Sequence, residues 1–315
     1  MNVFLLILMK ARKVHILLYY KFVNIKNPKK FAEEHLKICK SLGIFGKVLV
    51  AKEGINGSIS GTKLQAQKYK VILRKIPGFK DIIFKEELGF LHPFEKMLVR
   101  VKEQIIRLDE NVNMKKIGKY ISPKEFLALY KKKEDVIVLD ARNDYEYKAG
   151  KFKNAVAPKI KTFREFPKVL NLLKGKKDKK IVMYCTGGIR CEKASAYLVK
   201  EGFKDVSQLE GGIITFCQEY PNTVWEGKCF VFDKRLISSV DSKNIPLTKC
   251  KFCDIPCDLY QNCNNAKCNL LMNLCLSCEK THRGCCSPSC LSKYKQSLLK
   301  KAMINMPKRN EIKAI

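Results

Sequence analysis

The chain has 315 residues, enough for two to three domains, and its hydrophobic content of 46% excludes a wholly disordered protein. No apolar run approaches the roughly 18–20 residues that a membrane-spanning helix needs, so we expect no membrane partner. The 62 Lys and Arg residues outnumber the 30 Asp and Glu residues, which gives a formal net charge of +32. This excess favours a polyanionic partner such as nucleic acid, although a general bias toward lysine codons would produce it too.

Residues 1–13 form an N-terminal extension with an apolar stretch at residues 3–9. A secretory signal has basic residues before such a stretch and small residues after it. Here the basic residues Lys10, Arg12 and Lys13 follow it instead. The sequence therefore predicts a cytoplasmic protein.

Residues 14–108 alternate between strand-like and helix-like segments. Strands are expected at 14–20, 48–51, 82–84 and 97–101, helices at 27–42 and 63–75, and a turn at 53–57 with extended structure resuming at 58–60. The order β-α-β-α-β-β predicts a ferredoxin-like α+β sandwich, with one helix layer on one antiparallel sheet.

The rest of the chain divides into four parts. Residues 109–119 are polar and are expected to be a linker. Residues 120–226 contain short, continuous apolar strands at 136–140 and 180–184, which are typical of a parallel sheet covered on both faces. A cysteine-rich module is expected at 227–290, and a mobile basic tail at 291–315. The predicted fold class is therefore a multidomain α/β protein.

The motif with the most chemical content is a cysteine loop at residues 185–191. Cys185 ends a buried strand, Gly187 and Gly188 let the backbone turn, and a helix follows, so several backbone N–H groups point into one concavity. Such a site lowers a thiol pKa, and Arg190 adds a fixed positive charge. We therefore predict Cys185 and Arg190 as catalytic residues, with Gly187 and Gly188 lining the substrate site.

The size of this loop restricts its ligand. Six residues run from Cys185 to Arg190, one fewer than in phosphatases of the Cys-x5-Arg type, and Tyr184 replaces the histidine usual before their cysteine. The smaller concavity suits a single terminal sulfur on the cysteine. The alternative interpretation is a buried strand-end cysteine beside a glycine turn. Cys191 is either a resolving thiol or a small buried residue.

Residues 120–225 resemble a rhodanese domain. The resemblance rests on the segments 139–142, 145–158 and 209–213 as well as on the cysteine loop, with mild departures at Phe152 and Asn154. Together with residues 51–60, residues 19–22 and the cysteine-rich module, the chain resembles the bacterial tRNA uridine hydroxylase family (TrhO, or YceA, type) over about residues 14–290. That family joins a ferredoxin-like domain, a rhodanese domain and a cysteine-rich region.

The resemblance implies a function that the loop alone does not. It implies a tRNA-modifying oxidoreductase that converts the wobble uridine at position 34 of the anticodon arm to 5-hydroxyuridine, with molecular oxygen as co-substrate. Two chemical hypotheses stay open for Cys185: addition to C6 of the uracil ring, or a persulfide or sulfenic species that takes part in oxygen transfer. The alternative functions are a sulfurtransferase that passes sulfane sulfur from Cys185 to an acceptor, and a catalytically silent RNA-binding module. No glycine-rich nucleotide-cofactor fingerprint follows a strand.

The cysteine-rich module suggests a metal. Ten of the 15 cysteines lie between Cys250 and Cys290, and two Cys-x2-Cys pairs fit tetrahedral metal binding. Because cytosolic disulfides are disfavoured, structural zinc is the expected metal, with an iron–sulfur cluster or metal-free thiols as alternatives. Ten thiols could serve two four-cysteine sites with two to spare, or one site together with redox thiols. His282 is expected to be a surface residue rather than a ligand. The predicted metal ligands are Cys250, Cys253, Cys275 and Cys278, followed by Cys257, Cys285, Cys286 and Cys290.

Four further residues are candidates for substrate binding. Glu53 and Asn56 lie in the predicted turn and either line the nucleotide pocket or serve only the turn. Arg100 and Lys102 alternate along a strand and share one face. Beside Tyr19 or Phe22 they would bind RNA through phosphates and stacking, although a solvated strand face is the simpler interpretation.

Overall fold

The computed structural model describes residues 13–132, 134–238, 240 and 243–304, so the predicted extension lies outside the described residues except for Lys13. The chain forms two compact units, Met1–Asn244 and Ile245–Ile315. The second unit therefore begins later than the cysteine-rich module that the sequence predicted from residue 227. Residues 227–244 belong to the first unit, where the Lys228 amide donates to Ala149 and the Asn244 side chain donates to Trp225.

The first unit begins with a five-stranded sheet. Its strands are β1 (Val14–Phe22), β2 (Phe45–Ala51), β3 (Gly54–Gly61), β4 (Phe84–Gly89) and β5 (Met97–Val101), in the order β4-β1-β3-β2-β5. All neighbours are antiparallel except β2 and β5, which are parallel. The ferredoxin-like architecture is confirmed. The turn predicted at 53–57 is shorter than expected and lies at residues 52–53, because β3 already begins at Gly54 and pairs with both β1 and β2. The order is therefore β-α-β-β-α-β-β.

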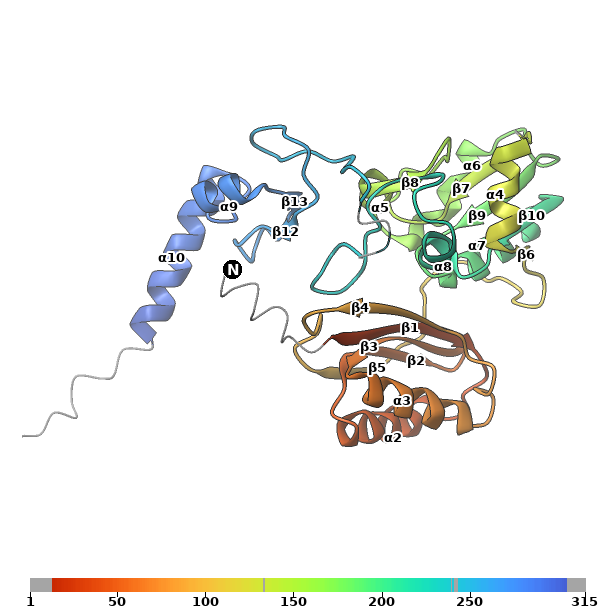
Figure 1. Cartoon of the computed structure of the whole chain (residues 1–315), viewed down its shortest axis with the longest axis horizontal. Helices are drawn as coiled ribbons and strands as arrows, with labels where there is room; N and C mark the ends of the chain where they lie inside the picture. The colour runs from red at the N-terminus through yellow and green to blue at the C-terminus, as the bar shows by residue number, and fades with distance from the viewer. Residues whose placement is uncertain (1–12, 133, 239, 241–242, 305–315) are drawn as a thin grey trace, which may run out of the picture. The chain divides into compact units, whose positions relative to one another are not determined.

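Helices α2 (Pro28–Ser41) and α3 (Lys63–Lys75) cover one face of this sheet (Figure 1). Each begins with a side-chain cap, Asn27 for α2 and a capping box of Thr62 and Gln65 for α3. Alternate residues of β1 serve the two faces. Leu17 and Tyr19 pack under the helices, whereas the neighbouring residues project from the opposite face. That second face carries the functional residues described below.

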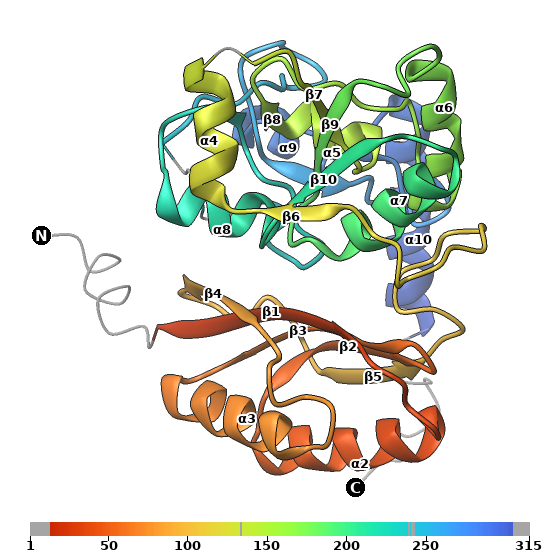
Figure 2. The same ribbon diagram turned by 90° about the vertical axis from the view of Figure 1, so that its right-hand side faces the viewer.

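The second sheet of this unit is parallel, as predicted. Its strands are β6 (Lys119–Ile121), β7 (Ile137–Asp140), β9 (Lys180–Tyr184) and β10 (Asp205–Leu209), in the order β6-β10-β9-β7 (Figure 2). Both faces are buried, because Ile181 and Met183 pack into one core and Val182 and Tyr184 into the other. Strand β9 lies between two other strands and is covered on both faces, so it rigidly supports Cys185, the residue that follows it.

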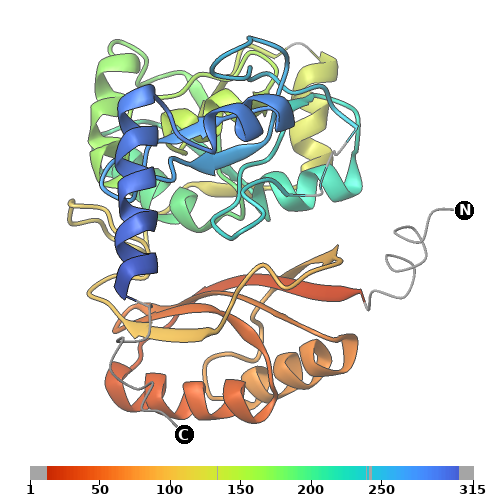
Figure 3. The same cartoon turned by 90° about the vertical axis from the view of Figure 1, so that its left-hand side faces the viewer.

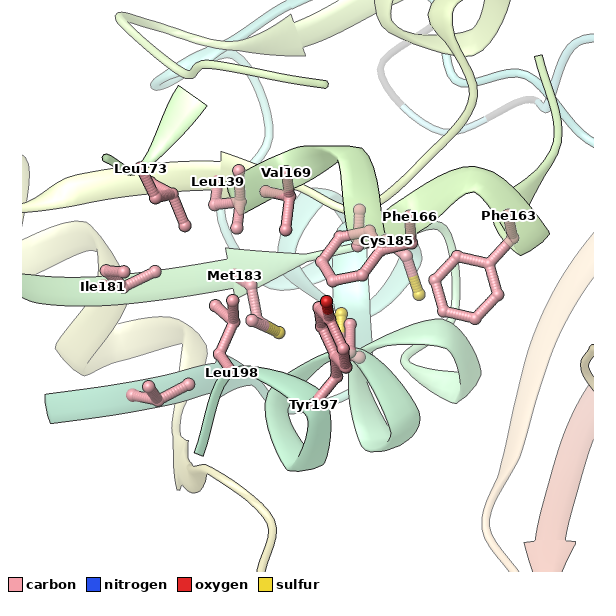
Figure 4. Packing of buried hydrophobic residues seen from close by; sticks show 14 of the residues in the cluster. Leu139, Phe163, Phe166, Val169, Leu173, Ile181, Met183, Cys185, Tyr197 and Leu198 are labelled. Atoms are coloured by element: carbon pink, nitrogen blue, oxygen red, sulfur yellow. The ribbon is translucent and has the colours of Figure 1, made fainter. Parts of the chain in front are cut away.

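Helices cover both faces of the parallel sheet. Residues of α6 (Val169–Leu172) and α7 (Ile189–Lys200) fill one core, next to a 3-10 turn at Phe163–Lys168, and residues of α4 (Pro123–Lys132) and α8 (Gly212–Glu219) fill the other. The remaining elements are α5 (Asp144–Ala149) and an antiparallel pair of short strands, β8 (Gly150–Phe152) and β11 (Trp225–Gly227). Figure 4 shows the α6–α7 core, which extends up to Cys185.

The second unit contains little regular structure. It consists of a hairpin of β12 (Tyr260–Asn262) and β13 (Leu271–Asn273), followed by α9 (Leu276–His282) and α10 (Pro288–Ile304) (Figure 3). Helix α10 covers the beginning of the predicted basic tail, and residues 305–315 lie outside the described residues. None of the helices in the described part of the chain combines the length and hydropathy of a membrane span.

Candidate active site

Cys185 lies directly after β9, in a loop whose backbone points toward its sulfur. The Gly188 amide donates to Cys185 Sγ at 3.1 Å, and Gly188 adopts a positive φ of 101° just before α7 begins. The first turn of α8 holds the loop from behind, because the Ile213 amide donates to the Cys185 carbonyl at 3.0 Å. At Gly212 a Cβ would lie 2.4 Å from that carbonyl, so this close approach requires glycine.

The surroundings of Cys185 favour the thiolate. Burial by itself would raise the pKa of this thiol, but a hydrogen bond from the Cys191 thiol, the charge of Arg190 and the amides of residues 190 and 191 together lower it to about 5. Burial raises the pKa of Cys191 well above its ordinary value, so Cys191 remains a neutral donor. A thiol with a pKa near 5 is ionised at neutral pH and is the nucleophilic form.

Arg190 is held by a carboxylate rather than by solvent. Its guanidinium makes two hydrogen bonds to Glu146, of 2.6 and 2.8 Å, and a third of 3.2 Å to the Thr186 hydroxyl. Glu146 in turn caps the start of α5 through the Asn143 amide. The planar guanidinium is thus fixed close to Cys185, where its charge stabilises the thiolate. Glu146 is a positioning residue that the loop motif alone did not indicate.

The Cys185 side chain is fully buried, yet it lines a cavity of about 630 Å³ that is open to solvent. The cysteine loop forms one side of this cavity, and Phe163, seen beside Cys185 in Figure 4, contributes an aromatic surface. Phe232, which is 61% exposed, lines it as well. A ligand that enters the cavity from solvent could therefore reach the thiolate.

The N-terminal sheet supplies another wall of the same cavity. Tyr20 and Lys85 line it from β1 and β4, and the Lys85 ammonium lies 5.3 Å from the centre of the Tyr20 ring. The Tyr20 hydroxyl donates to Glu192 in α7 at 2.8 Å, and Tyr120 donates to the same carboxylate oxygen at 2.7 Å. Burial lowers the pKa of Lys85. The sequence did not indicate that Tyr20 or Lys85 lies at the cysteine loop, although residues 19–22 carry part of the family resemblance.

The four predicted substrate-binding residues of the N-terminal domain have different positions. Asn56 lines the cavity and also donates to the Ile105 carbonyl at 3.0 Å. Glu53 does not line it; its carboxylate accepts from the Ile105 amide at 2.7 Å and pairs with Lys193 at 2.9 Å. Arg100 and Lys102 are exposed at the β5 edge of the sheet and do not line the cavity.

Eight cysteines of the second unit form two groups in which all four sulfurs lie within 4.8 Å of one another. The first group is Cys250, Cys253, Cys275 and Cys278, and the second is Cys263, Cys268, Cys286 and Cys290. Both groups have the residue types and closeness that a tetrahedral metal site needs. The structure differs from the predicted ligand set at Cys257 and Cys285, which are buried outside both groups, while Cys263 and Cys268 take part. His282 is outside the groups and stacks on Phe252.

Fold and loop together define a class, namely rhodanese-domain proteins with an activated cysteine. Three domain families match the chain in succession: a UPF0176 acylphosphatase-like domain at residues 14–105, a rhodanese-like domain at 122–219 and a rhodanase C-terminal domain at 226–291.

Similar proteins extend this class to most of the chain. A tRNA uridine(34) hydroxylase of Bacillus licheniformis is 47% identical over 280 residues, covering 86% of each chain. Proteins of the same name from Bacillus cytotoxicus and Bacillus mycoides are each 45% identical, over 285 and 287 residues, and cover 87% and 89% of this chain and 87% and 90% of their own. The chain belongs to the tRNA uridine(34) hydroxylase family.

Proposed function

We propose that this protein hydroxylates C5 of uridine 34 in tRNA, producing 5-hydroxyuridine. The proposal is carried by one observation, a thiolate with a pKa of about 5 that faces a cavity in a chain whose relatives bear the name of this activity. We further propose a cytoplasmic protein that binds the anticodon arm. The net charge of +32 supports a polyanionic partner. A tRNA is such a partner, because it carries one negatively charged phosphate per nucleotide.

The size and lining of the cavity suit a flipped-out nucleotide. A volume of about 630 Å³ lies within the range of about 300–1,000 Å³ that small-molecule sites occupy. The rings of Tyr20, Phe163 and Phe232 offer faces on which a base can stack, and Arg107 and Arg164 lie on the same lining for contact with phosphate. Single-stranded anticodon bases can unstack and enter such a site at low cost.

In the proposed chemistry, the Cys185 thiolate adds to C6 of the uracil ring. The new C6–S bond moves the C5=C6 electron pair to C5, which becomes the enolate carbon. A dithiol reductant, itself oxidised to a disulfide, reduces dioxygen to hydrogen peroxide. C5 then bonds to one peroxide oxygen, and the O–O bond breaks to release the other oxygen as water after protonation. Loss of the C5 proton and expulsion of Cys185 restore the C5=C6 bond.

The positions of the fixed groups fit this course. Arg190, held by Glu146, stabilises the anionic form of Cys185 Sγ both when this sulfur attacks and when it leaves. The Gly188 amide donates to the same sulfur. Lys85 lines the cavity from β4 and would place a positive charge near a uracil carbonyl oxygen on which negative charge develops. The buried environment of the loop strengthens both interactions.

The second unit is proposed to hold structural zinc. Four thiolates leave zinc no open coordination position, so the metal is assigned to folding rather than to the hydroxylation step.

Sulfur transfer is the second candidate function, and the loop itself favours it. The amides that surround Cys185 also suit a terminal persulfide sulfur. In that reaction the persulfide S–S bond breaks, the outer sulfur passes to a nucleophilic acceptor, and Cys185 leaves as the thiolate.

Mass spectrometry of tRNA nucleosides separates these candidates. We expect 5-hydroxyuridine and its derivatives to disappear in a deletion strain, to return with the natural gene, and to stay absent with Cys185→Ser. Cys217→Ala, which removes a buried thiol of α8, is the matched control and should restore the modification. Loss of thiolated nucleosides instead of 5-hydroxyuridine would establish the sulfur-transfer alternative. Retained 5-hydroxyuridine in the Cys185→Ser strain would eliminate any role for the thiolate.

A second experiment addresses the C6 adduct. The last step of the proposed reaction removes the C5 proton and expels Cys185. Fluorine at C5 cannot be lost in this way, so tRNA carrying 5-fluorouridine at position 34 should remain covalently bound to Cys185. A persulfide or sulfenic mechanism predicts no such complex. Denaturing mass measurement of the mixture distinguishes the two mechanisms, and Cys185→Ser is the blank.

A further inference from the structure

We infer that the second unit binds two zinc ions in two interleaved sites, each of which depends on the other for its formation. The first site is Cys250, Cys253, Cys275 and Cys278, and the second is Cys263, Cys268, Cys286 and Cys290. The inference goes beyond the reaction at Cys185 and does not depend on it.

The distances between sulfurs fit metal ligands and not disulfides. Cys253 and Cys275 are separated by 3.7 Å between their sulfurs, Cys268 and Cys286 by 3.6 Å, and Cys286 and Cys290 by 3.5 Å. A zinc ion with four sulfurs at about 2.3 Å places neighbouring sulfurs about 3.8 Å apart by tetrahedral geometry. A disulfide requires about 2.05 Å. These three distances are therefore close to the edge length of a zinc–thiolate tetrahedron, and the other sulfurs of each group lie within 4.8 Å of one another.

Backbone hydrogen bonds to sulfur repeat between the two groups. The Cys275 amide donates to Cys250 Sγ at 3.4 Å, and the Cys286 amide donates to Cys263 Sγ at the same distance. In each group the donor is the third cysteine in chain order and the acceptor is the first. Donors to the sulfurs offset part of the negative charge that four thiolates bring to a divalent ion. The side chain of Asn265 adds a further donor to Cys290 at 3.3 Å.

The order of the ligands along the chain interleaves the two sites. Each site takes two cysteines from an early pair and two from a late pair, and the early pair of the second site lies between the two pairs of the first. Closing the first site joins Cys253 to Cys275, 22 residues later, around Cys263 and Cys268. Closing the second joins Cys268 to Cys286, 18 residues later, around Cys275 and Cys278.

The hairpin between the sites transmits this dependence. Strands β12 and β13 pair through Gln261 and Met272, and the Cys263 amide donates to the Leu270 carbonyl at 2.8 Å where the hairpin continues into the second site. The first site resumes just after β13, at Cys275. Each ion therefore fixes one end of the same short hairpin. A two-stranded hairpin of this length has little stability of its own.

Apolar packing is too limited to fold this unit without metal. The fully buried members of its core are four cysteines with Met272 and Leu274. Domains of this size rarely gain enough free energy from a hydrophobic core alone and usually need disulfides or a metal. The described cysteines form no disulfide. Two of the four buried thiols, Cys257 and Cys285, belong to neither group and serve as core residues.

The test counts zinc ions on the full-length chain by native mass spectrometry. We expect two per chain. When zinc is added stepwise to the chelated chain, chains with no ion and with two ions should dominate at one equivalent. A dominant one-ion species at that point would overturn the interdependence. Iron with inorganic sulfide, or disulfides with no metal, would overturn the assignment of zinc.

Single substitutions provide the matched comparison. Cys253→Ser and Cys268→Ser each remove one exposed ligand, from different sites, and each should lose both ions. Cys257→Ala and Cys285→Ala remove thiols of the same unit outside the groups and should keep two. A Cys268→Ser chain that keeps one ion in a protease-resistant second unit would contradict the proposal. Alkylation of Cys185 at pH 6 should be unchanged in all four variants, which separates this result from the fate of the proposed reaction.

Discussion

Tyr20 of β1 donates a hydrogen bond of 2.8 Å to Glu192, two residues after Arg190 in α7. The contact joins residues 172 positions apart and links the N-terminal sheet to the helix that begins at the cysteine loop. The next residue, Lys193, pairs with Glu53 at 2.9 Å and so makes a second link to the same domain. The first turn of α7 therefore has two roles. Arg190 stabilises the Cys185 thiolate, and Glu192 and Lys193 bind residues of the N-terminal sheet domain.

Tyr20→Phe should weaken that attachment without removing the ring from the cavity wall. The variant loses one hydrogen bond to a buried carboxylate, so we expect the free energy of unfolding to fall by about 1–2 kcal/mol. Urea denaturation followed by circular dichroism measures the change. Lys30→Ala, at an exposed position of α2, is the control and should shift the midpoint little. An unchanged midpoint for Tyr20→Phe would mean that the contact does not stabilise the docked domain.

Gly187 and Gly188 should respond differently to alanine. At Gly188 φ is 101°, and a Cβ would lie 2.9 Å from the Tyr20 hydroxyl, so Gly188→Ala strains the backbone by about 1–3 kcal/mol and displaces the amide that donates to Cys185. At Gly187 the nearest contact would be Lys85 Cδ at an ordinary 3.8 Å. We expect Gly188→Ala to lower tRNA hydroxylation at least tenfold and Gly187→Ala to lower it less than threefold. Equal losses would contradict the assigned role of the Gly188 amide.

The reactivity of Cys185 should titrate near pH 5. The thiolate is the form that reacts with iodoacetamide, so the alkylation rate should fall as the pH drops through about 5 and stay level up to neutral pH. Arg190→Met removes the guanidinium charge that lowers this pKa, so the midpoint should rise by at least one pH unit and the rate at pH 6 should fall. Peptide mass mapping of Cys185 over pH 4–9 measures both profiles. A midpoint near 8.5 in the natural protein would refute thiolate activation.

Lys85 should matter more for tRNA than for the thiolate. Lys85→Met removes a cavity cation, and we expect kcat/KM for tRNA to fall about tenfold, equivalent to about 1.4 kcal/mol. The alkylation midpoint of Cys185 should rise less than in Arg190→Met, because Lys85 and Cys185 interact electrostatically but the Cys191 thiol, Arg190 and backbone amides affect the Cys185 pKa more. Lys85→Arg keeps the charge and should recover most of the activity. A large shift of the midpoint in Lys85→Met would assign this lysine to the thiol instead.

Much of the architecture could be predicted because the signals are local. The continuous apolar residues of β9, the glycines and Arg190 lie within eleven consecutive positions, so the strand, the loop and the direction of its amides follow from one short segment. The helix layer on the N-terminal sheet follows from similar patterns. Only the first half of β3, residues 54–57, is predicted as a turn, because its glycines resemble turn residues. The close approach of Gly54 to Lys21 in the paired strand is what requires one of these glycines.

The sequence by itself pointed to Cys185 as the candidate reactive thiol, because nucleophile, amide donors and guanidinium are neighbours in the chain. Only the tertiary structure decided what faces that thiol and how the other cysteines divide. Lys85 and Tyr20 reach the cavity because a separate domain docks there, and Glu146 finds Arg190 from 44 residues away. The metal-site partners are joined across loops of about twenty residues, and many pairings close such loops at nearly the same entropic cost. Spacing therefore could not choose between Cys257 and Cys263, whereas the packed hairpin does.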